Sequence, residues 1–308
     1  MSGEVPVSVV IVSDYTPSAA KEATYLEACL AGLAAQVDAG EVEWILVLTT
    51  DVGSAPPGLP PAVQLLHAPG ATSFQAKNVG AEAARHPILA FTDADCVPTP
   101  QWLQQIRRAM REMPEVAAIS GKTVYAEQEF LPRACCLIGR AYIDPGEVSA
   151  AQDIANHNFA IRREAYRSCP LPNEATPFGG TLYGARLRAA GHAIVFDPAV
   201  LTYHVYDGWA AECDIRRNRG YAAVHHRRHH PEVPQAWLGR LGLLGVPPLW
   251  LGSLLQSCFT CLRRASDYGV RAYELPGVLC VAFVLYAHDL TGMLDAVRGR
   301  PLRDTVYH

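Results

Sequence analysis

The chain has 308 residues, of which 50% are hydrophobic and only 18% are charged. This composition excludes a disordered chain, because disordered segments are poor in apolar residues and rich in charge. Lys and Arg number 26 and Asp and Glu 30, so the formal net charge of −4 argues against an electrostatic grip on nucleic acid. We expect one large α/β domain or two smaller ones, with no nucleic-acid partner and with some apolar surface.

The cysteines and the N-terminal residues indicate in which cellular compartment the protein is expected. Nine cysteines are an odd number without a paired framework, so we expect reduced thiols in the cytoplasm. Cys258 and Cys261 form a CxxC inside an apolar run, and with no second pair this favours core packing over a zinc site. No basic segment precedes the first apolar stretch, so that stretch is interpreted as a strand and not as a signal peptide.

Strand and helix patterns alternate along the first two thirds of the chain. The run VSVVIV at 7–12 is typical of a strand buried on both faces of a parallel sheet. Residues 122–150 have no clear period, and no element is assigned to them. The other predicted elements are a helix at 25–34, strands at 44–48 and 63–66, a helix at 73–85, a strand at 88–91, a helix at 100–113, strands at 116–121 and 157–162, a helical turn at 163–168, a helix at 181–190, and strands at 193–196 and 201–204.

This alternation predicts an α/β fold with an open, mostly parallel central sheet and helices on both faces. In such sheets the ligand crevice lies beyond the carboxyl ends of the strands. Acidic residues follow three of the predicted strands there, namely Asp14, Asp51, and the pair Asp93 and Asp95. Two carboxylates one residue apart at a strand end can share a divalent cation, Mn²⁺ or Mg²⁺, and the diphosphate that it neutralises.

Beyond residue 209 the composition changes. A basic helix comes first, and its His and Arg side chains favour a surface that meets phosphates or lipid headgroups over a metal site. Residues 241–262 and 275–288 then contain no Asp, Glu, Lys or Arg. About 20 apolar residues span a bilayer, but Pro247 and Pro248 interrupt the first run and the second is too short. We expect two helices that lie in the membrane interface or pack on the domain; spanning helices and a soluble helical cap are the alternatives.

At this point the sequence resembles the family 2 glycosyltransferases of GT-A fold. The likeness covers roughly residues 5 to 205 and rests on several motifs in the expected order. These motifs are VSVVIVSDY, GATSFQAKNVGAEAA, ILAFTDADCVPTPQWL, NHNFAIRREAY and TLYGARLRAAGHAIVFDPAVLTYH. The resemblance implies a GT-A-like, Rossmann-related sheet, with residues 1–208 binding a nucleotide-diphosphate sugar and residues 209–308 forming a helical, partly apolar region.

The resemblance also implies roles for single residues. Asp51 is expected near the donor base, Asp93 near the ribose or the metal, and Asp95 on the metal and the diphosphate. Lys77 and Asn78 match a pair that lies beside the donor. His204 matches a histidine that can complete the metal shell. Each has a plainer alternative: a turn residue for Asp51, solvated surface for Lys77 and Asn78, and a core histidine for His204.

One departure concerns the general base. Members of the family carry an acidic pair just before the helix that here runs TLYGARLRAAG, and one of its carboxylates deprotonates the acceptor. This sequence has Pro177-Phe178-Gly179-Gly180 there. Since a general base contributes about 10²–10⁴-fold, three readings stay open. Glu174 or Asp153 supplies the base, the acceptor is a lipid phosphate that needs none, or the protein is a degenerate, non-catalytic binding protein.

The sequence therefore predicts a metal-dependent, inverting glycosyltransferase. The donor is a nucleotide sugar, and the acceptor is a glycan, a lipid or a small molecule. We expect a cytoplasmic protein, peripheral at the inner face of the membrane. A nicotinamide-dependent dehydrogenase is disfavoured because no GxGxxG follows the first strand.

Overall fold

The computed structural model describes residues 5–14, 20–37, 40–51, 55–56, 58–173 and 179–302. The chain divides into two compact units. The first, called the sheet unit, comprises residues 1–123, 147–175 and 187–205, and the second, called the helical unit, comprises residues 124–146, 176–186 and 206–308. Each is described by itself below.

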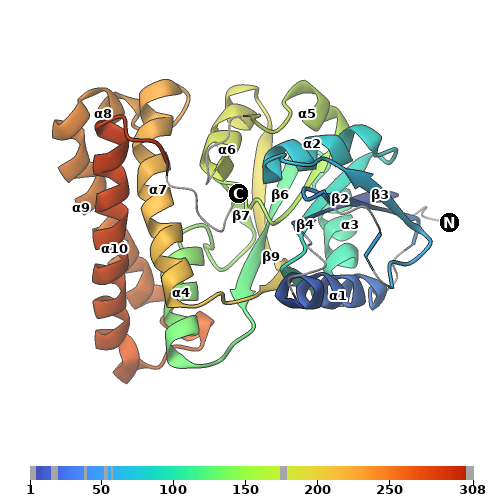
Figure 1. The fold of residues 1–308 in the computed structure, drawn as a ribbon, viewed down its shortest axis with the longest axis horizontal. Coiled ribbons are helices and arrows are strands. Elements are labelled where there is room, and N and C mark those ends of the chain that lie inside the picture. The colour runs from blue at the N-terminus through green and yellow to red at the C-terminus, as the bar shows by residue number, and fades with distance from the viewer. Residues whose placement is uncertain are drawn as a thin grey trace. The chain divides into compact units, whose positions relative to one another are not determined.

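The strands of the central sheet alternate with helices in the order that the sequence predicts (Figure 1). The strands are β1 (Val7–Ser13), β2 (Val42–Leu48), β3 (Val63–His67), β4 (Ile88–Asp93), β5 (Cys96–Pro98), β6 (Val116–Tyr125), β7 (Ser149–Ala150), β8 (Asn158–Arg162) and β9 (Ala193–His204). The helices of the sheet unit are α1 (Ala20–Ala34), α2 (Ser73–Ala83), α3 (Trp102–Glu112) and α5 (Arg163–Ser168), while α6 (Gly179–Ala189) has residues in both units. The predicted α/β fold class is confirmed.

The sheet runs in the order β3-β2-β1-β4-β8-β6-β9-β5, with β7 added against β9. The neighbouring strands β3, β2, β1 and β4 are parallel, whereas β8 joins β4 in the antiparallel direction. In the second half of the sheet, β5 and β7 both pair with β9, also antiparallel. The parallel strands therefore all end at one edge, where the predicted acidic residues lie.

The core of the sheet unit lies between the sheet and the helices α1 and α3. Alternate residues of β1 face these helices, since neighbouring side chains of a strand point to opposite faces. The buried cluster includes Val7, Val9, Ile11, Leu26, Leu33, Leu103 and Ile106. The other face of β1 carries α2, and Gly80 allows this helix to approach closely, because a Cβ at Gly80 would lie 2.4 Å from Val10 Cγ1.

One prediction from the sequence is wrong, and one segment left without an assignment contains a helix. The strands predicted at 193–196 and 201–204 are one strand, β9, because Asp197 does not act as a turn residue. Its carboxylate is 1% exposed and accepts a hydrogen bond from Arg108 at 2.8 Å. The segment without a clear period contains a helix, α4 (Phe130–Arg140), whose Pro132 lies in its first turn, where no backbone donor is needed.

The helical unit contains three long helices and several short ones. Its elements are α4, α7 (Trp209–His229), α8 (Ala236–Arg240), η1 (Gly242–Gly245), α9 (Val246–Arg264), η2 (Ala265–Tyr268), η3 (Ala272–Glu274) and α10 (Leu275–Val297). Pro247 and Pro248 begin α9 instead of breaking it. The buried cluster of this unit joins α4, α9 and α10 through residues such as Leu137, Cys261 and Leu285. Two helical stretches, Gly242–Tyr268 and Ala272–Val297, are long and apolar enough to cross a membrane by length and composition alone.

Candidate functional site

The strand β4 ends at Asp93, and the turn that follows carries Asp95 into β5. The short strand β5 pairs with the end of β9, with Cys96 opposite His204. This register brings His204 Nε2 to 3.4 Å from Asp95 Oδ2, and Cys96 Sγ donates to Asp95 Oδ1 at 3.5 Å. The antiparallel pairing thus brings together two predicted metal ligands that are more than a hundred residues apart in sequence.

The imidazole of His204 is held in a defined orientation. Its Nδ1 lies 2.6 Å from the carbonyl oxygen of Val205 and donates to it, which directs Nε2 toward Asp95. A histidine whose second ring nitrogen donates to a carbonyl is the usual arrangement of a metal ligand. Asp95 keeps 28% of its side chain exposed, so the pair is open to a ligand from solution.

The donor set fits a divalent cation. Within the described part of the chain, one group of three His, Cys, Asp or Glu side chains brings its ligand atoms within 4.8 Å of one another: Asp95, Cys96 and His204. A carboxylate and an imidazole suit Mn²⁺, and the thiol adds a softer ligand. Sequence reasoning missed Cys96, although its position directly after Asp95 was a signal.

Asp93 faces a different partner. Its Oδ1 lies 2.5 Å from the Nζ of Lys77, and the same Nζ donates to Ser73 Oγ at 2.6 Å. Lys77 is completely buried, while 27% of the Asp93 side chain is exposed. Burial raises the pKa of Asp93 and the nearby Lys77 ammonium acts against that rise. Lys77 is therefore not solvated surface: it places one positive charge beneath the acidic pair.

Asn78 binds neighbouring protein groups. Its Nδ2 donates to the carbonyl of Leu171 at 3.0 Å and to Asn173 Oδ1 at 2.8 Å, and its Oδ1 accepts from the hydroxyl of Tyr166. The helix α2 that carries Lys77 and Asn78 begins with a capping box between Thr72 and Gln75. Asn78 thus connects α2 to the segment at 171–173.

Two further acidic residues, Asp51 and Asp14, follow parallel strands at the same edge. Asp51 follows β2 and is exposed, and Asp14 follows β1. Desolvation raises the pKa of Asp14, and the neighbouring carboxylates, Asp95 foremost, raise it further. Asp153 lies half-buried between β7 and β8. Glu174, the other candidate base, lies outside the described residues.

A second histidine borders the site. The ring of His157 lies 5.4 Å from that of His204, edge to face, and its Nε2 is 3.0 Å from Thr123 Oγ1. His157 precedes β8, so it reaches the site from the antiparallel half of the sheet. Sequence reasoning placed His157 at the start of the predicted strand 157–162 but assigned it no role in the site.

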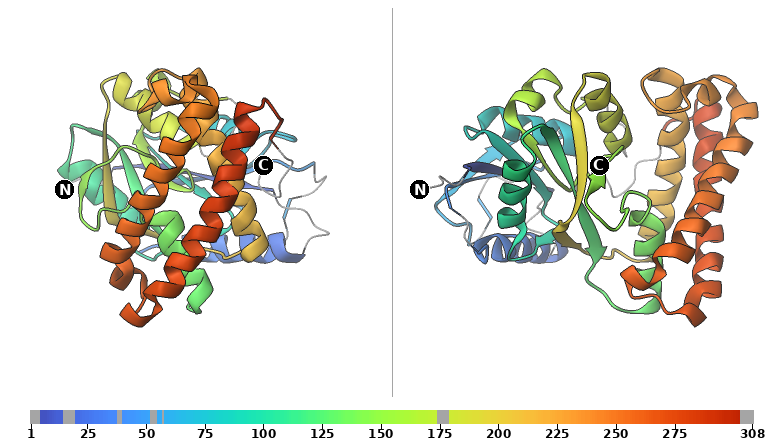
Figure 2. Two further views of the ribbon diagram at one scale, coloured as in Figure 1. Left: turned by 90° about the vertical axis from the view of Figure 1, so that its left-hand side faces the viewer. Right: turned by 180° about the vertical axis from the view of Figure 1, so that it is seen from behind.

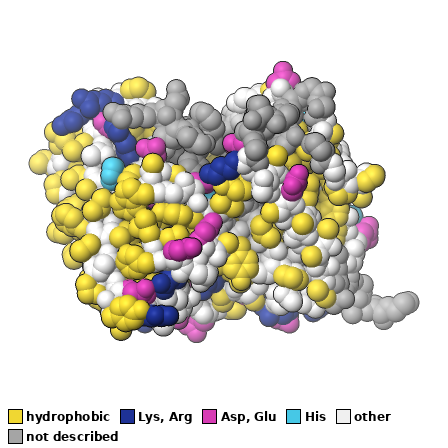
Figure 3. Space-filling model, turned by 60° about the horizontal axis from the view of Figure 1, so that its bottom comes forward, with side chains coloured by type: hydrophobic (Ala, Val, Ile, Leu, Met, Phe, Trp, Pro, Cys, Tyr) yellow, Lys and Arg dark blue, Asp and Glu magenta, His cyan; other side chains and the backbone are white. Residues whose placement is uncertain are grey.

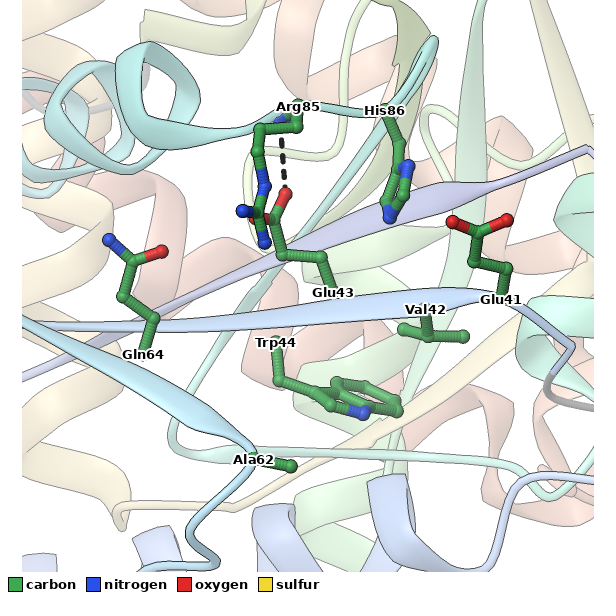
Figure 4. Close-up of a pocket in the computed structure, with 8 residues that line it drawn as sticks. All are labelled: Glu41, Val42, Glu43, Trp44, Ala62, Gln64, Arg85 and His86. Atoms are coloured by element: carbon green, nitrogen blue, oxygen red, sulfur yellow. Dashed lines mark hydrogen bonds and ion pairs between the residues drawn. The ribbon is translucent and has the colours of Figure 1, made fainter.

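A surface pocket lies at the opposite ends of the strands, at the starts of β2 and β3 and just before β4 (Figure 4). Glu43 is its most buried acidic group, and its carboxylate accepts from Ser8 Oγ at 2.6 Å and from the Arg85 backbone N–H at 2.9 Å. These hydrogen bonds lower the pKa of Glu43 although burial alone would raise it. The pocket is separate from the acidic edge because it lies at the opposite ends of the strands, and its buried carboxylate is already bound by protein groups.

Comparisons with known proteins show which family and which solved structures this chain is similar to. Residues 18–169 match the model of Glycosyl transferase family 2. The fold is similar to the mannosyltransferase PcManGT from Pyrobaculum calidifontis, solved in complex with GDP-Man and Mn²⁺ (TM-score 0.60, 14% identity, 97% of this chain and 89% of that chain). It is also similar to TarS 1–349 from S. aureus (TM-score 0.50, 14% identity, 97% and 93%). No curated protein matches the sequence. The chain therefore carries a Glycosyl transferase family 2 domain on a GT-A fold and is a family 2-like glycosyltransferase.

Proposed function

We propose that this protein transfers a sugar from a nucleotide-diphosphate donor to an acceptor at a membrane surface, with inversion at the anomeric carbon and with a divalent cation. One observation carries the proposal. The carboxylate of Asp95 and the oriented imidazole of His204 meet at the carboxyl end of β4, next to the Asp93–Lys77 pair. A metal-binding pair at that edge of an α/β sheet is suited to a diphosphate.

In this proposal each residue has a defined task. Asp95 and His204 hold the cation, and Asp93 lies near the ribose or joins the metal shell. Bound there, Mn²⁺ or Mg²⁺ supplies positive charge for the leaving diphosphate. Lys77 fixes Asp93, Asn78 shapes the wall beside the donor, and Asp51 lies where the base would reach.

The identity of the donor is the least constrained part. The mannosyltransferase of the same fold was solved with GDP-Man and Mn²⁺, which makes this pair the first donor and metal to test. At 14% identity that likeness supports the fold alone, so UDP- and GDP-linked sugars are tested side by side.

The acceptor is proposed to be a lipid phosphate. In the transfer, a bond forms between the acceptor oxygen and the anomeric carbon while the bond from that carbon to the diphosphate breaks. A hydroxyl acceptor must also give its proton to a base, with Glu174 and Asp153 as the candidates, whereas a phosphate is already ionised near neutral pH. The helix α6 begins at Gly179, where the family carries its acidic pair, and this favours the acceptor without a proton to lose.

The same proposal divides the chain. Residues 1–208 would bind the donor, and residues 209–308 would be the helical region that brings the protein to its acceptor. The protein would then be cytoplasmic and peripheral at the inner face of the membrane.

Calorimetry with Mn²⁺ and each nucleotide sugar tests the donor site. We expect wild type to bind one donor, and Asp95→Ala to lose more than about 100-fold in affinity. The matched control is Glu112→Ala, because Glu112 is an exposed carboxylate on α3 and should bind as wild type does. Equal binding by Asp95→Ala and wild type would refute the metal role of Asp95.

A second candidate function is a non-catalytic nucleotide-sugar-binding protein, which the Gly179-Gly180 sequence favours. The two are separated by supplying a polyprenyl phosphate together with the donor that binds. Formation of a glycosylated lipid phosphate identifies the transferase. Donor binding without any transfer or donor hydrolysis identifies the binding protein.

A further inference from the structure

The exposed side of α9 carries a stripe of apolar residues. Leu251, Leu255, Phe259 and Leu262 follow one another at spacings of four, four and three residues, so they form one stripe on the helix. Between 49% and 59% of each residue is exposed. The preceding turn η1 adds Leu243 and Leu244, which are 57% and 79% exposed.

The neighbouring helix α10 extends this stripe. Phe283 and Val284 are 60% and 43% exposed on α10. The two helices run next to each other on one surface of the helical unit (Figure 2, left), and hydrophobic side chains gather at the left of the space-filling view (Figure 3). We call the six residues of η1 and α9 together with Phe283 and Val284 the apolar face.

The buried side of α10 packs against α7 and carries two carboxylates among apolar residues. Asp295 pairs with Arg217, and Asp289 pairs with Arg219 at 3.6 Å. Asp289 and Asp295 are 1% and 7% exposed, so both carboxylates are covered by protein. Two glycines make this close contact possible. A Cβ on Gly220 of α7 would lie 1.9 Å from the carbonyl oxygen of Asp289, and a Cβ on Gly292 of α10 would lie 1.8 Å from the carbonyl oxygen of Arg217.

This packing argues against a bilayer-spanning role for α10. If α10 crossed a membrane, α7 would lie in it as well, together with its arginines and histidines. Placing such side chains in hydrocarbon is costly, because they lose their hydration there. The arrangement fits a helical unit that lies on a membrane and touches it on one side only.

The ends of the apolar face show which surface it fits. No Asp or Glu occurs between residues 241 and 262. The exposed Arg240 comes directly before this run, and the exposed Arg263 comes directly after it. Further out along the sequence lie Trp237 and Tyr273, which are 62% and 72% exposed. Apolar side chains bordered by arginine and amphipathic aromatic rings are typical of the boundary between lipid and water, and the positive charge complements anionic headgroups.

We propose that the apolar face inserts into one leaflet of an anionic bilayer, with α9 and α10 parallel to the membrane plane, Arg240 and Arg263 on lipid phosphates, and α7 on the water side. The inference deepens the proposed function, since it supplies the surface on which a lipid acceptor would be met. It does not depend on catalysis, because membrane binding and donor binding are measured separately.

Co-sedimentation of the full-length protein with vesicles tests this surface. We expect binding to phosphatidylcholine vesicles that contain phosphatidylglycerol, and a loss of more than about tenfold when Leu251, Leu255 and Phe259 are all changed to Ser. The control is Val37→Ser with Val148→Ser, because both valines are exposed but lie in the sheet unit. Circular dichroism and donor binding establish that each variant is folded.

A second pair of variants separates the charges from the apolar contact. Arg240→Glu with Arg263→Glu should weaken binding to anionic vesicles about tenfold or more and should remove most of its salt dependence. Washing loaded vesicles with alkaline carbonate should release the wild-type protein, as for a surface-bound protein.

Three outcomes would overturn the proposal. They are wild-type protein that ignores anionic vesicles, a triple serine variant that binds them as wild type does, and protein that resists carbonate extraction as a spanning protein would. If the triple variant instead converts a dimer into a monomer without affecting vesicle binding, the apolar face is an interface between copies of this chain. Intact donor binding in any of these cases leaves the proposed transferase function standing.

Discussion

The acidic edge of the sheet unit and the contact between α7 and α10 in the helical unit differ in how they treat charged side chains. In the sheet unit the strand interiors are apolar, and acidic side chains stand at the strand ends, where Asp93 and Asp95 keep 27% and 28% exposure. In the helical unit Arg216 and Asp289 are 2% and 1% exposed, whereas leucines cover the outside of α9. The acidic edge presents charge to water, whereas the helical unit encloses charge between α7 and α10 and exposes apolar residues on α9.

This difference indicates different surroundings. Exposed carboxylates at a strand edge suit a polar, metal-bound ligand that arrives from water. A helical unit that encloses ion pairs and exposes an apolar stripe is poorly suited to water on that side. Exposed apolar surface of that extent is typical of an interaction site. The three predictions below test this contrast, beginning with the largest expected effect.

The contact between α7 and α10 should be the most sensitive part of the helical unit. We expect Gly220→Val to lower the free energy of unfolding by more than about 4 kcal/mol, because the new side chain would collide with the backbone of Asp289. Urea denaturation measures the change.

A matched glycine on α9 gives the control. Nothing lies within 4 Å of the position that a Cβ on Gly252 would occupy. Gly252→Ala should therefore leave stability unchanged or raise it by up to about 1 kcal/mol. Equal effects of the two substitutions would show that α7 and α10 are not packed as described.

The helical unit should also lose stability in mild acid through His226. Burial, reinforced by His225 and His230, lowers the pKa of His226 to about 3. Below the unfolded pKa of about 6.5 the unfolded chain binds a proton that the folded chain does not. Stability is complete above that pH and falls by up to about 1.4 kcal/mol per pH unit, or about 3 kcal/mol by pH 4.

Thermal unfolding between pH 7 and pH 4 measures this slope. His226→Gln should flatten it, whatever its effect on stability at pH 7. His229→Gln should leave the slope unchanged, because His229 is exposed on the same helix. A slope that survives His226→Gln would assign the acid sensitivity to another group.

The smallest of the three effects concerns the sheet unit. Lys77→Met should lower the free energy of unfolding by about 2 kcal/mol, because it leaves Asp93 without its buried cation. The value is below that for a fully buried pair, since water reaches Asp93. Arg111→Met, an exposed change on α3, should have almost no effect. If Lys77→Met is equally silent, the Lys77–Asp93 pair does not stabilise the site.

Local sequence patterns predicted much of the fold and part of the site. The run at 7–12 predicted β1, and the position of Asp93 and Asp95 after an apolar strand predicted the acidic edge, because both depend on neighbouring residues alone. The helix α4 escaped prediction because Pro132 reads as a breaker, and only its place in the first turn makes it harmless.

The contacts that make the site depend on pairing across the chain. Nothing near Asp95 in sequence indicates that Cys96 faces His204, since this register arises from an antiparallel pairing of β5 with β9. The burial of Lys77 likewise depends on the approach of α2 to β1 at Gly80.

The sequence alone determined the alternation of strands and helices, the acidic residues at the strand ends and the two charge-free runs at 241–262 and 275–288, because period and composition are local properties. The tertiary structure decided which charges are paired and which apolar residues are left outside. From the sequence, Asp289 and Asp295 are unexplained charges in an apolar helix, and the structure shows that Arg219 and Arg217 of α7 pair with them. The structure also shows that Leu251, Leu255 and Phe259 form the side that no other described part of the helical unit covers. Burial and charge pairing are relations between distant segments, and folding alone brings those segments together.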